Sequence, residues 1–333
     1  MFELSFIWAG IIAFAVLTYV ILDGFDLGVG ILFPFAKSER DKSTMMNSIA
    51  PIWDGNETWL VMGGGGLFAV FPLAYAVIMP ALYMPIILML LALIFRGVAF
   101  EYRWRTDRWK PVWDVAFFGG SLVAAFMQGI ALGALVQGIE VADRAYAGGW
   151  WDWLSLFSVL TGLAVVIGYA LLGATWVILK TEGSLQRQMQ NYAWWLGAGT
   201  LGFIAVVSVL TPFQDPEYFN RWLNLPGSIF SVLMPVAVFG AAWALFTGLN
   251  AGKDGQPFFA AITIFVLCFV GIGISFYPNI VPPSLTIAEA AAPDKSLRFA
   301  LVGTVVLVPL ILIYTAYAYW VFRGKIDPDE GYH

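Results

Sequence analysis

Histidine and cysteine are almost absent from this chain of 333 residues. The only histidine is the last residue, His333, and the only cysteine, Cys268, lies inside an apolar run. A lone cysteine excludes an internal disulfide. A lone terminal histidine excludes the usual imidazole ligation of hemes within the chain, so hemes that work with it must lie in another subunit. No basic cluster with interleaved aromatic residues is present, which argues against nucleic acid as a partner.

Charge is also scarce, because charged residues make up 12% of the chain and hydrophobic residues 60%. Apolar runs recur that exceed the roughly 18 residues needed to cross a bilayer as a helix. They predict about nine spans, at residues 6–35, 57–71, 76–100, 113–138, 153–179, 192–210, 227–249, 258–277 and 297–322.

These runs are far longer than the roughly 10-residue strands of a membrane barrel, so the predicted fold is an all-α, polytopic helix bundle. We expect residues 1–333 to form a single integral membrane domain, because no polar stretch is long enough for a soluble one. The first span lacks a preceding basic segment and carries two aspartates, so we do not expect it to be a cleaved signal peptide.

Basic residues cluster in the loops on one side of the nine-span arrangement. The positive-inside rule therefore places the N-terminus outside and the C-terminus in the cytoplasm. The residues on the basic side are Lys37, Arg40, Lys42, Arg103, Arg105, Arg108, Lys110, Lys180, Arg187, Lys253, Arg323 and Lys325, against Arg144, Arg221, Lys295 and Arg298 on the other side.

Ionisable residues inside spans are the strongest candidates for function, since a charge at the bilayer centre costs at least roughly 2.5–3.5 kcal/mol. The first span carries Asp23 and Asp26, whose spacing puts both carboxylates on one helix face. The second span begins with Asp54, Asn56 and Glu57 in the same half of the membrane.

Arg96, near the cytoplasmic end of the third span, lies at a similar depth and is a natural counter-ion for one of the aspartates. Two structural interpretations compete with a proton relay. Asp54 could cap the N-terminus of its helix, and Asp23 or Asp26 could form a purely structural salt bridge with Arg96.

Four motifs together resemble one known family, subunit II of the cytochrome bd quinol oxidases, and are most similar to its cyanide-insensitive branch. The resemblance extends from the first span to the last, in family order. The motifs are DGFDLGVG (23–30), NSIAPIWDGNETWL (47–60), FRGVAFEYR (95–103) and FYPNIVPPSLTIAEAAAPDKSL (276–297).

The resemblance implies a subunit without its own axially ligated heme, in the bacterial cytoplasmic membrane. Two b-type hemes, one heme d and the quinol-oxidising loop would belong to the partner, subunit I. The complex would oxidise quinol with dioxygen, form water, and separate charge by drawing protons from the cytoplasm. A small single-span accessory subunit, membrane lipid and a bound quinone or lipid are further expected partners.

The resemblance also implies roles for particular residues. Asp26 and Asp54 match acidic residues of the family's proposed proton path, to which we add Asp23 and Glu57. Trp59 matches an aromatic position near a proposed oxygen path, and Trp53 and Asn56 are expected to support the acids. A proton-coupled secondary transporter and a purely structural or assembly subunit are the alternatives.

Overall fold

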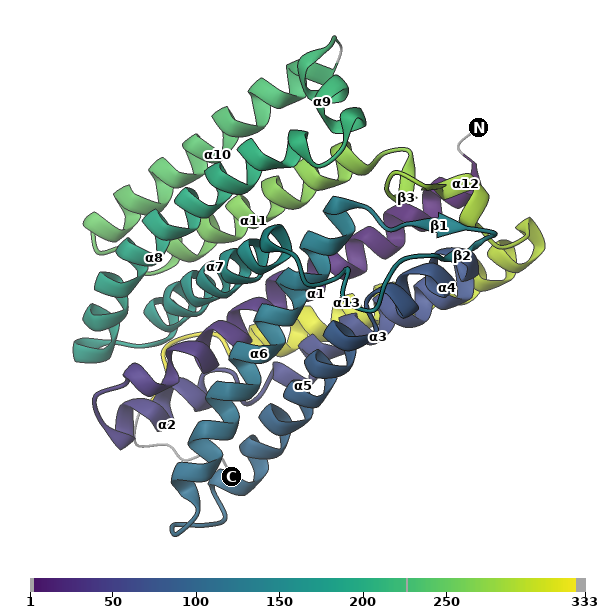
Figure 1. Cartoon of the computed structure of the whole chain (residues 1–333). Coiled ribbons are helices and arrows are strands. Elements are labelled where there is room, and N and C mark those ends of the chain that lie inside the picture. The colour runs from purple at the N-terminus through teal and green to yellow at the C-terminus, as the bar shows by residue number, and fades with distance from the viewer. Residues whose placement is uncertain (1–2, 226, 328–333) are drawn as a thin grey trace.

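The computed structural model describes residues 3–225 and 227–327, which form one elongated helix bundle (Figure 1). In this part of the chain, eight helices are long and apolar enough to cross a membrane. This confirms the predicted polytopic all-α fold. The eight are α1 (Leu4–Leu32, extended by η1, Phe33–Phe35), α5 (Tyr83–Arg103), α6 (Lys110–Gln137), α7 (Leu156–Lys180), α8 (Gly183–Leu210, extended by η2, Thr211–Phe213), α10 (Gly227–Asn250), α11 (Gly255–Phe276) and α13 (Asp294–Val321).

The remaining elements are short, apart from one. Two antiparallel hairpins and small helices connect the spans, and α3 alone has the length of a span. These elements are α2 (Glu39–Asn47), α3 (Trp53–Val70), α4 (Pro72–Ala81), β1 (Val141–Ala142), β2 (Ala145–Tyr146), α9 (Pro216–Leu223), β3 (Asn279–Val281), β4 (Leu285–Thr286) and α12 (Ile287–Ala290).

The second and third predicted spans need correction. The second predicted span corresponds to α3, which begins at Trp53 and not at residue 57. It is not one of the eight, because Asp54, Asn56 and Glu57 in its first turns make it too polar. The predicted third span, 76–100, is two elements. Residues 76–81 belong to α4, which begins at Pro72, and the crossing helix α5 starts only after Leu82.

One end of the bundle, which we call the basic end, carries α2, the loop between α5 and α6, and the C-terminal ends of α7 and α13. The backbone N–H of Ile326 donates to the carbonyl of Lys180 there (2.9 Å). At the opposite end, the indole of Trp8 donates to the carbonyl of Leu297 (3.1 Å), which joins the starts of α1 and α13. The first and last spans therefore run in the same direction. That the basic end faces the cytoplasm stays a prediction.

Helix α1 lies at the centre and packs against α3, α6 and α7 (Figure 1). Its closest approach is to α7, where Gly28 faces Gly173. A β-carbon on Gly28 would collide with the carbonyl oxygen of Tyr169, and one on Gly173 would collide with the backbone of Gly28. Backbone contact between helices at small residues is a common way to pack in membranes. It holds the aspartates of α1 in a rigid pair of helices.

Candidate functional site

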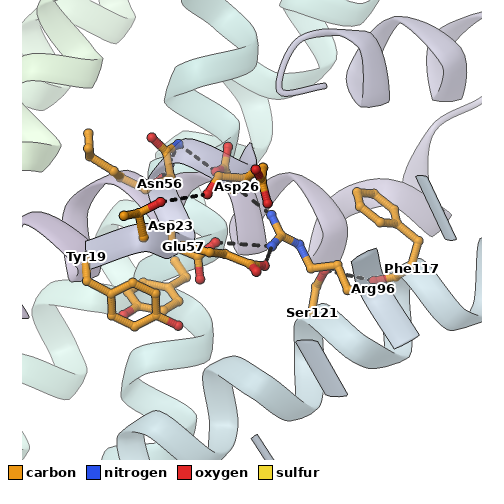
Figure 2. A network of polar contacts seen from close by, with 12 residues as sticks. Tyr19, Asp23, Asp26, Asn56, Glu57, Arg96, Phe117 and Ser121 are labelled. Carbon is orange, nitrogen blue, oxygen red and sulfur yellow. Dashed lines mark hydrogen bonds and ion pairs between the residues drawn. The ribbon is translucent and has the colours of Figure 1, made fainter. Parts of the chain in front are cut away.

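The acidic segments of α1 and α3 meet at Arg96 of α5 (Figure 2). Its Nη1 donates to Glu57 Oε1 at 2.7 Å and to Asp23 Oδ1 at 3.2 Å. Its Nη2 lies 3.9 Å from Asp26 Oδ2. The spacing of three residues between Asp23 and Asp26 places both on the face of α1 that is turned toward α5. The structure thus brings three carboxylates from two helices around one guanidinium, and we call these four residues the Arg96 cluster.

The cluster is buried almost completely. The side chains of Arg96, Asp23 and Asp26 are 0% exposed, and that of Glu57 is 25% exposed. Three carboxylates face a single cation here, and one oxygen of each aspartate has no hydrogen-bond partner. Carboxylates that share a desolvated site cannot all be ionised at once without a large cost. Charge balance alone therefore makes this a place where a proton can be held.

Asn56 joins the cluster to the last span. Its amide nitrogen donates to Asp26 Oδ2 at 2.7 Å, and its amide oxygen accepts from the hydroxyl of Tyr319 on α13 at 2.9 Å. The Asn56 side chain is buried. It fixes the position of Asp26, while α13 in turn fixes Asn56.

Aromatic rings close the side of the cluster that faces the basic end. Trp53 stacks on Phe100 with the ring centroids 4.8 Å apart and the planes at 1°. The Arg96 guanidinium lies 5.8 Å from both ring centroids. Such cation–π contacts hold an arginine without neutralising it. The positive charge of Arg96 remains available to the three carboxylates.

A second polar chain extends from Asp23 into the middle of the bundle. Tyr19, one turn before Asp23 on α1, begins this chain (Figure 2). Gln128 of α6 donates to the Tyr19 hydroxyl at 2.8 Å and accepts from the Tyr169 hydroxyl at 2.7 Å. Because Gln128 occupies an acceptor position of Tyr19, the hydroxyl hydrogen of Tyr19 is free to point toward Asp23.

Asp54 lies outside this network. It is the second residue of α3, its side chain is exposed, and the residue at the N-cap is Ile52, which makes no side-chain cap. The capping interpretation of Asp54 was therefore wrong. Asp54 stands one helical turn before Glu57, so the exposed acid and the half-covered acid follow each other along one face of α3.

Trp59 is buried, but away from the charges. It packs against α1 beside Ala15 and Tyr19, and its ring lies edge-on to Phe14 with the centroids 5.8 Å apart. Trp59 therefore anchors α3 to α1. Its assignment to an oxygen path stays a prediction.

Four residues of the network were not found from the sequence: Tyr19, Gln128, Tyr169 and Tyr319. Gln128 carried a signal, because an amide in the middle of an apolar span needs a partner. The three tyrosines carried none, since tyrosine is common in membrane spans and at their ends.

Comparison with known proteins shows the family of this chain. A family model for cytochrome bd terminal oxidase subunit II matches residues 4–322. The chain belongs to this family. The cytochrome bd-I ubiquinol oxidase subunit 2 of Escherichia coli K12 is 31% identical, over 98% of this chain and 96% of that protein. The cytochrome bd ubiquinol oxidase subunit 2 of Bacillus subtilis is 30% identical, over 99% of both.

A solved structure shows the same fold. A chain of the bd oxidase from Geobacillus thermodenitrificans superposes with a TM-score of 0.78 and 18% identity, over 96% of this chain and 99% of that one. The chain is therefore a multi-pass subunit of a bd-type oxidase in the bacterial cytoplasmic membrane. These comparisons give no support to the secondary-transporter alternative.

That this chain ligates no heme stays a prediction. His333 lies outside the described residues, and among the described ones no group of three histidine, cysteine or acidic side chains could hold a metal. Met45, Met46 and Met189 are fully buried in the apolar core. Buried methionines among apolar side chains fill space rather than ligate.

A second charged group lies at the basic end, around Arg103. Its Nε donates to Asp114 Oδ1 at 2.6 Å and its Nη2 to Glu39 Oε2 at 3.1 Å. Lys42 bonds the same two carboxylates at 3.0 Å each, and Lys110 lies 3.4 Å from Glu39. Cations outnumber acids here, the reverse of the Arg96 cluster. We call these five residues the Arg103 cluster.

Two groups of the Arg103 cluster have shifted pKa values. Partial burial acts to raise the pKa of Glu39, but the hydrogen bond and charge of Lys42, with the charge of Arg103, outweigh it and leave the pKa lowered. Burial acts to lower the pKa of Lys42, and its bonds to Asp114 and Glu39 outweigh it and leave the pKa raised. Both residues are therefore held in their charged forms.

Proposed function

We propose that this chain is the subunit of a quinol oxidase that takes up protons from the cytoplasm, through Asp54, Glu57, Asp23 and Asp26, while the partner subunit carries the hemes. The observation that carries the proposal is the Arg96 cluster, with three acids and one cation buried together. The relatives named ubiquinol oxidase subunit 2 support the choice of reaction.

The proposed chemistry divides between two subunits. In subunit I, quinol gives up electrons to two hemes b and one heme d, and dioxygen is reduced to water. The protons that enter the water come from the cytoplasmic side, so the reaction separates charge across the membrane. This chain contributes no ligand to the hemes. It supplies groups that accept a proton and pass it on.

The geometry suggests the order in which the acids receive a proton. Asp54 is exposed and receives the proton first, and Glu57, one turn further along α3, is the half-covered intermediate. Glu57 shares the Arg96 guanidinium with Asp23, so a proton that arrives on Glu57 releases Arg96 to pair more fully with Asp23. A cavity of about 30 Å³ beside Gly55, Asn56 and Tyr319 has room for about one water on this side.

Arg96 and Asn56 would position the acids and carry no protons themselves. An arginine stays charged in proteins, so Arg96 acts as a fixed positive reference for whichever carboxylate is ionised. Asn56 holds the Asp26 oxygen that faces Arg96. Trp53 and Phe100 keep water from reaching Arg96 from the side they cover.

The surface of α3 suggests where subunit I binds. Asp54 and Thr58 are exposed on this span, Glu57 is partly exposed, and a β-carbon on Gly64 or Gly65 would meet nothing within 4 Å. Acidic and hydroxyl side chains are costly against lipid tails, and open glycines allow another helix to come close. We infer that subunit I covers this face. A small accessory subunit and a bound quinone stay predictions.

The test compares Asp54→Asn and Glu57→Gln with Glu101→Gln in the purified complex. Each change keeps the shape and removes a titratable proton, and Glu101 is an exposed acid of α5 whose ion pair among the described residues is with Arg105. Loss of a proton-transfer group typically costs roughly 10²–10⁴-fold in rate. We expect oxidase turnover to fall strongly in the first two variants, with heme spectra intact, and to stay normal in the third.

Two results would separate the alternatives. Full turnover and normal proton uptake in both Asp54→Asn and Glu57→Gln would reject the relay. Loss of heme or of complex yield, in step with lost turnover, would instead assign the acids a structural or assembly role. Copurification of a larger hemoprotein with b-type and chlorin bands tests the pairing itself.

A further inference from the structure

A cavity lies at the basic end of the bundle, between α1, α7, α11 and α13. Its volume is about 530 Å³, within the roughly 300–1,000 Å³ typical of small-molecule sites. Most of its wall is apolar, and the apolar lining includes Leu22, Phe25, Phe258, Phe259 and Ile262. A long hydrocarbon chain matches such a wall. The Arg96 cluster does not line it.

The charged lining residues of this cavity are mostly cationic. Lys180, Arg323 and Lys325 stand against the single carboxylate of Asp254. Lys325 bonds Asp254 at 2.7 Å, which offsets one positive charge. Among the described residues, Lys180 and Arg323 have no acidic partner within bonding distance. An apolar cavity with uncompensated cations at its membrane-surface end suits an amphiphile with an anionic head.

Lys180 and Lys325 are held in place by backbone carbonyls. Lys180 Nζ donates to the carbonyls of Phe322 and Gly324, which follow α13. Lys325 Nζ donates in return to the carbonyls of Ile178 and Thr181 at the end of α7, at 3.1 and 2.9 Å. Neutral carbonyls fix the two ammonium groups without cancelling their charge. The two positive charges are therefore fixed where the C-terminal ends of α7 and α13 meet, and we call this positively charged edge of the cavity the cationic rim.

One donor in the wall has no acceptor. Trp176 lines the cavity, its side chain is 3% exposed, and its indole Nε1 has no hydrogen-bond partner. The ring is stacked on Phe25 with the centroids 4.3 Å apart, and Lys180 Nζ lies 5.1 Å from it. The indole is thus held next to the cationic rim. A buried N–H without an acceptor is costly, and a ligand that offers an oxygen would remove that cost.

We propose that this cavity binds one anionic phospholipid of the cytoplasmic leaflet. One acyl chain lies along Phe25, Phe258 and Ile262, and an ester oxygen accepts from the indole of Trp176. The phosphate faces Lys180 and Arg323. Basic pockets between spans on the cytoplasmic side are a recognised type of anionic-lipid site. A neutral quinone would fill the apolar part but would leave the cations unmatched. The site does not depend on the proposed proton path.

The test measures lipid retention by the whole purified complex with native mass spectrometry. Delipidated complex is titrated with dioleoyl phosphatidylglycerol or dioleoyl phosphatidylcholine, which have identical chains and different head charges. We expect the anionic lipid to bind with one tight site and the zwitterionic lipid to bind at least about fivefold more weakly, since one cation near the membrane surface contributes about that factor.

Three variants locate the site. Arg323→Gln should weaken the anionic lipid about fivefold and the zwitterionic lipid less, because the choline of the zwitterionic lipid offsets the charge of its phosphate. Within the described part of the chain, Arg323 bonds only the Trp320 carbonyl and lies over the Trp320 ring, so the fold should not depend on it. Trp176→Phe should weaken both lipids about threefold to tenfold, the contribution of one hydrogen bond. Ile262→Trp, which fills the cavity, should abolish the tight site for both.

Two matched controls and three results decide the proposal. Arg108→Gln removes another exposed arginine that lies over a tryptophan, Trp109, and Trp104→Phe removes another indole without a partner. Neither residue lines the cavity, so neither change should alter retention. Equal retention of the two lipids, equal losses in Arg108→Gln and Arg323→Gln, or a neutral quinone as the retained molecule would each overturn the proposal.

Discussion

Arg96 and Arg103 lie on the same face of α5, seven residues apart, and both side chains are fully buried, yet they have opposite surroundings. The aspartates around Arg96 are themselves 0% exposed. The acids around Arg103 reach solvent, with Asp114 at 14% and Glu39 at 58% exposed. The first arginine is enclosed by an excess of acid, whereas the second joins a group with an excess of cations.

This difference shows that burial of an arginine does not by itself indicate function. In the Arg103 cluster every acid has a cationic partner, and solvent screens the charges. The cluster therefore fixes α2 against α5 and α6. At Arg96 the acids cannot all find a cation, and the site stays open to protonation. Charge balance and exposure of the partners separate the two clusters, and variants of both can test the separation.

The largest effect is expected from Arg96→Gln. Removing the only cation leaves three carboxylates buried without compensation, and breaking such a pair typically costs about 3–5 kcal/mol. We expect little assembled complex, with low heme content and a clearly lower Tm. Assembly at wild-type yield and Tm would show that the acids are already neutral and that Arg96 does not hold them.

Double-mutant cycles then rank the partners of Arg96. Asp23 and Glu57 lie 3.2 and 2.7 Å from its Nη1, whereas Asp26 lies 3.9 Å from Nη2. We therefore expect coupling with Arg96→Gln to be larger for Asp23→Asn and Glu57→Gln than for Asp26→Asn, within the roughly 0.5–3 kcal/mol seen for contacting residues. Thermal unfolding of each single and double variant gives the coupling energies. If the effects of Asp26→Asn and Arg96→Gln were additive, Arg96 would not stabilise Asp26, which would leave Asn56 as the partner of Asp26.

An intermediate effect is expected from Arg103→Gln. It removes hydrogen bonds to two acids that can turn to solvent, so the cost should be roughly 1–3 kcal/mol. Oxidase turnover per heme should stay at the wild-type level, because the Arg96 cluster is untouched. If turnover instead fell as far as in Glu57→Gln, the Arg103 cluster would have to be part of the proton path.

The smallest effect is expected from Glu39→Gln and should depend on pH. The pKa of Glu39 in the folded protein lies below its ordinary value of 4.5. Its stabilising contribution is therefore complete above pH 4.5 and is lost as the pH falls through the lower folded value. Since Glu39 is largely exposed, the difference should be about 0–1 kcal/mol. A Tm difference between wild type and variant that grew on acidification would contradict this sign.

The sequence predicted the helical bundle because long apolar runs admit little else in a bilayer. It also predicted that two acidic segments lie at the depth of Arg96, since depth follows from counting residues along each span. The break between α4 and α5 was missed because residues 67–94 are apolar throughout. Only Pro72, Pro80 and Pro85 mark that region, and proline is tolerated in membrane helices.

Rotation of the helices could not be predicted in the same way. Asp54 and Glu57 are one turn apart, yet Asp54 is exposed whereas Glu57 reaches Arg96, because the packing of α1 against α3 decides which residues are covered. Tyr319 is 263 residues from Asn56 in the chain. No local pattern indicates a contact of that separation.

The contact of Gly28 with Gly173 has a consequence for how the family can vary. Any side chain at either position would force α1 and α7 apart and carry Asp23 and Asp26 away from Arg96. A saturation library at these two glycines should therefore accept almost nothing. Gly64 and Gly65 of α3 have open space around them in this chain. If substitutions at these two glycines were nevertheless not tolerated, another polypeptide of the complex would have to contact α3 there.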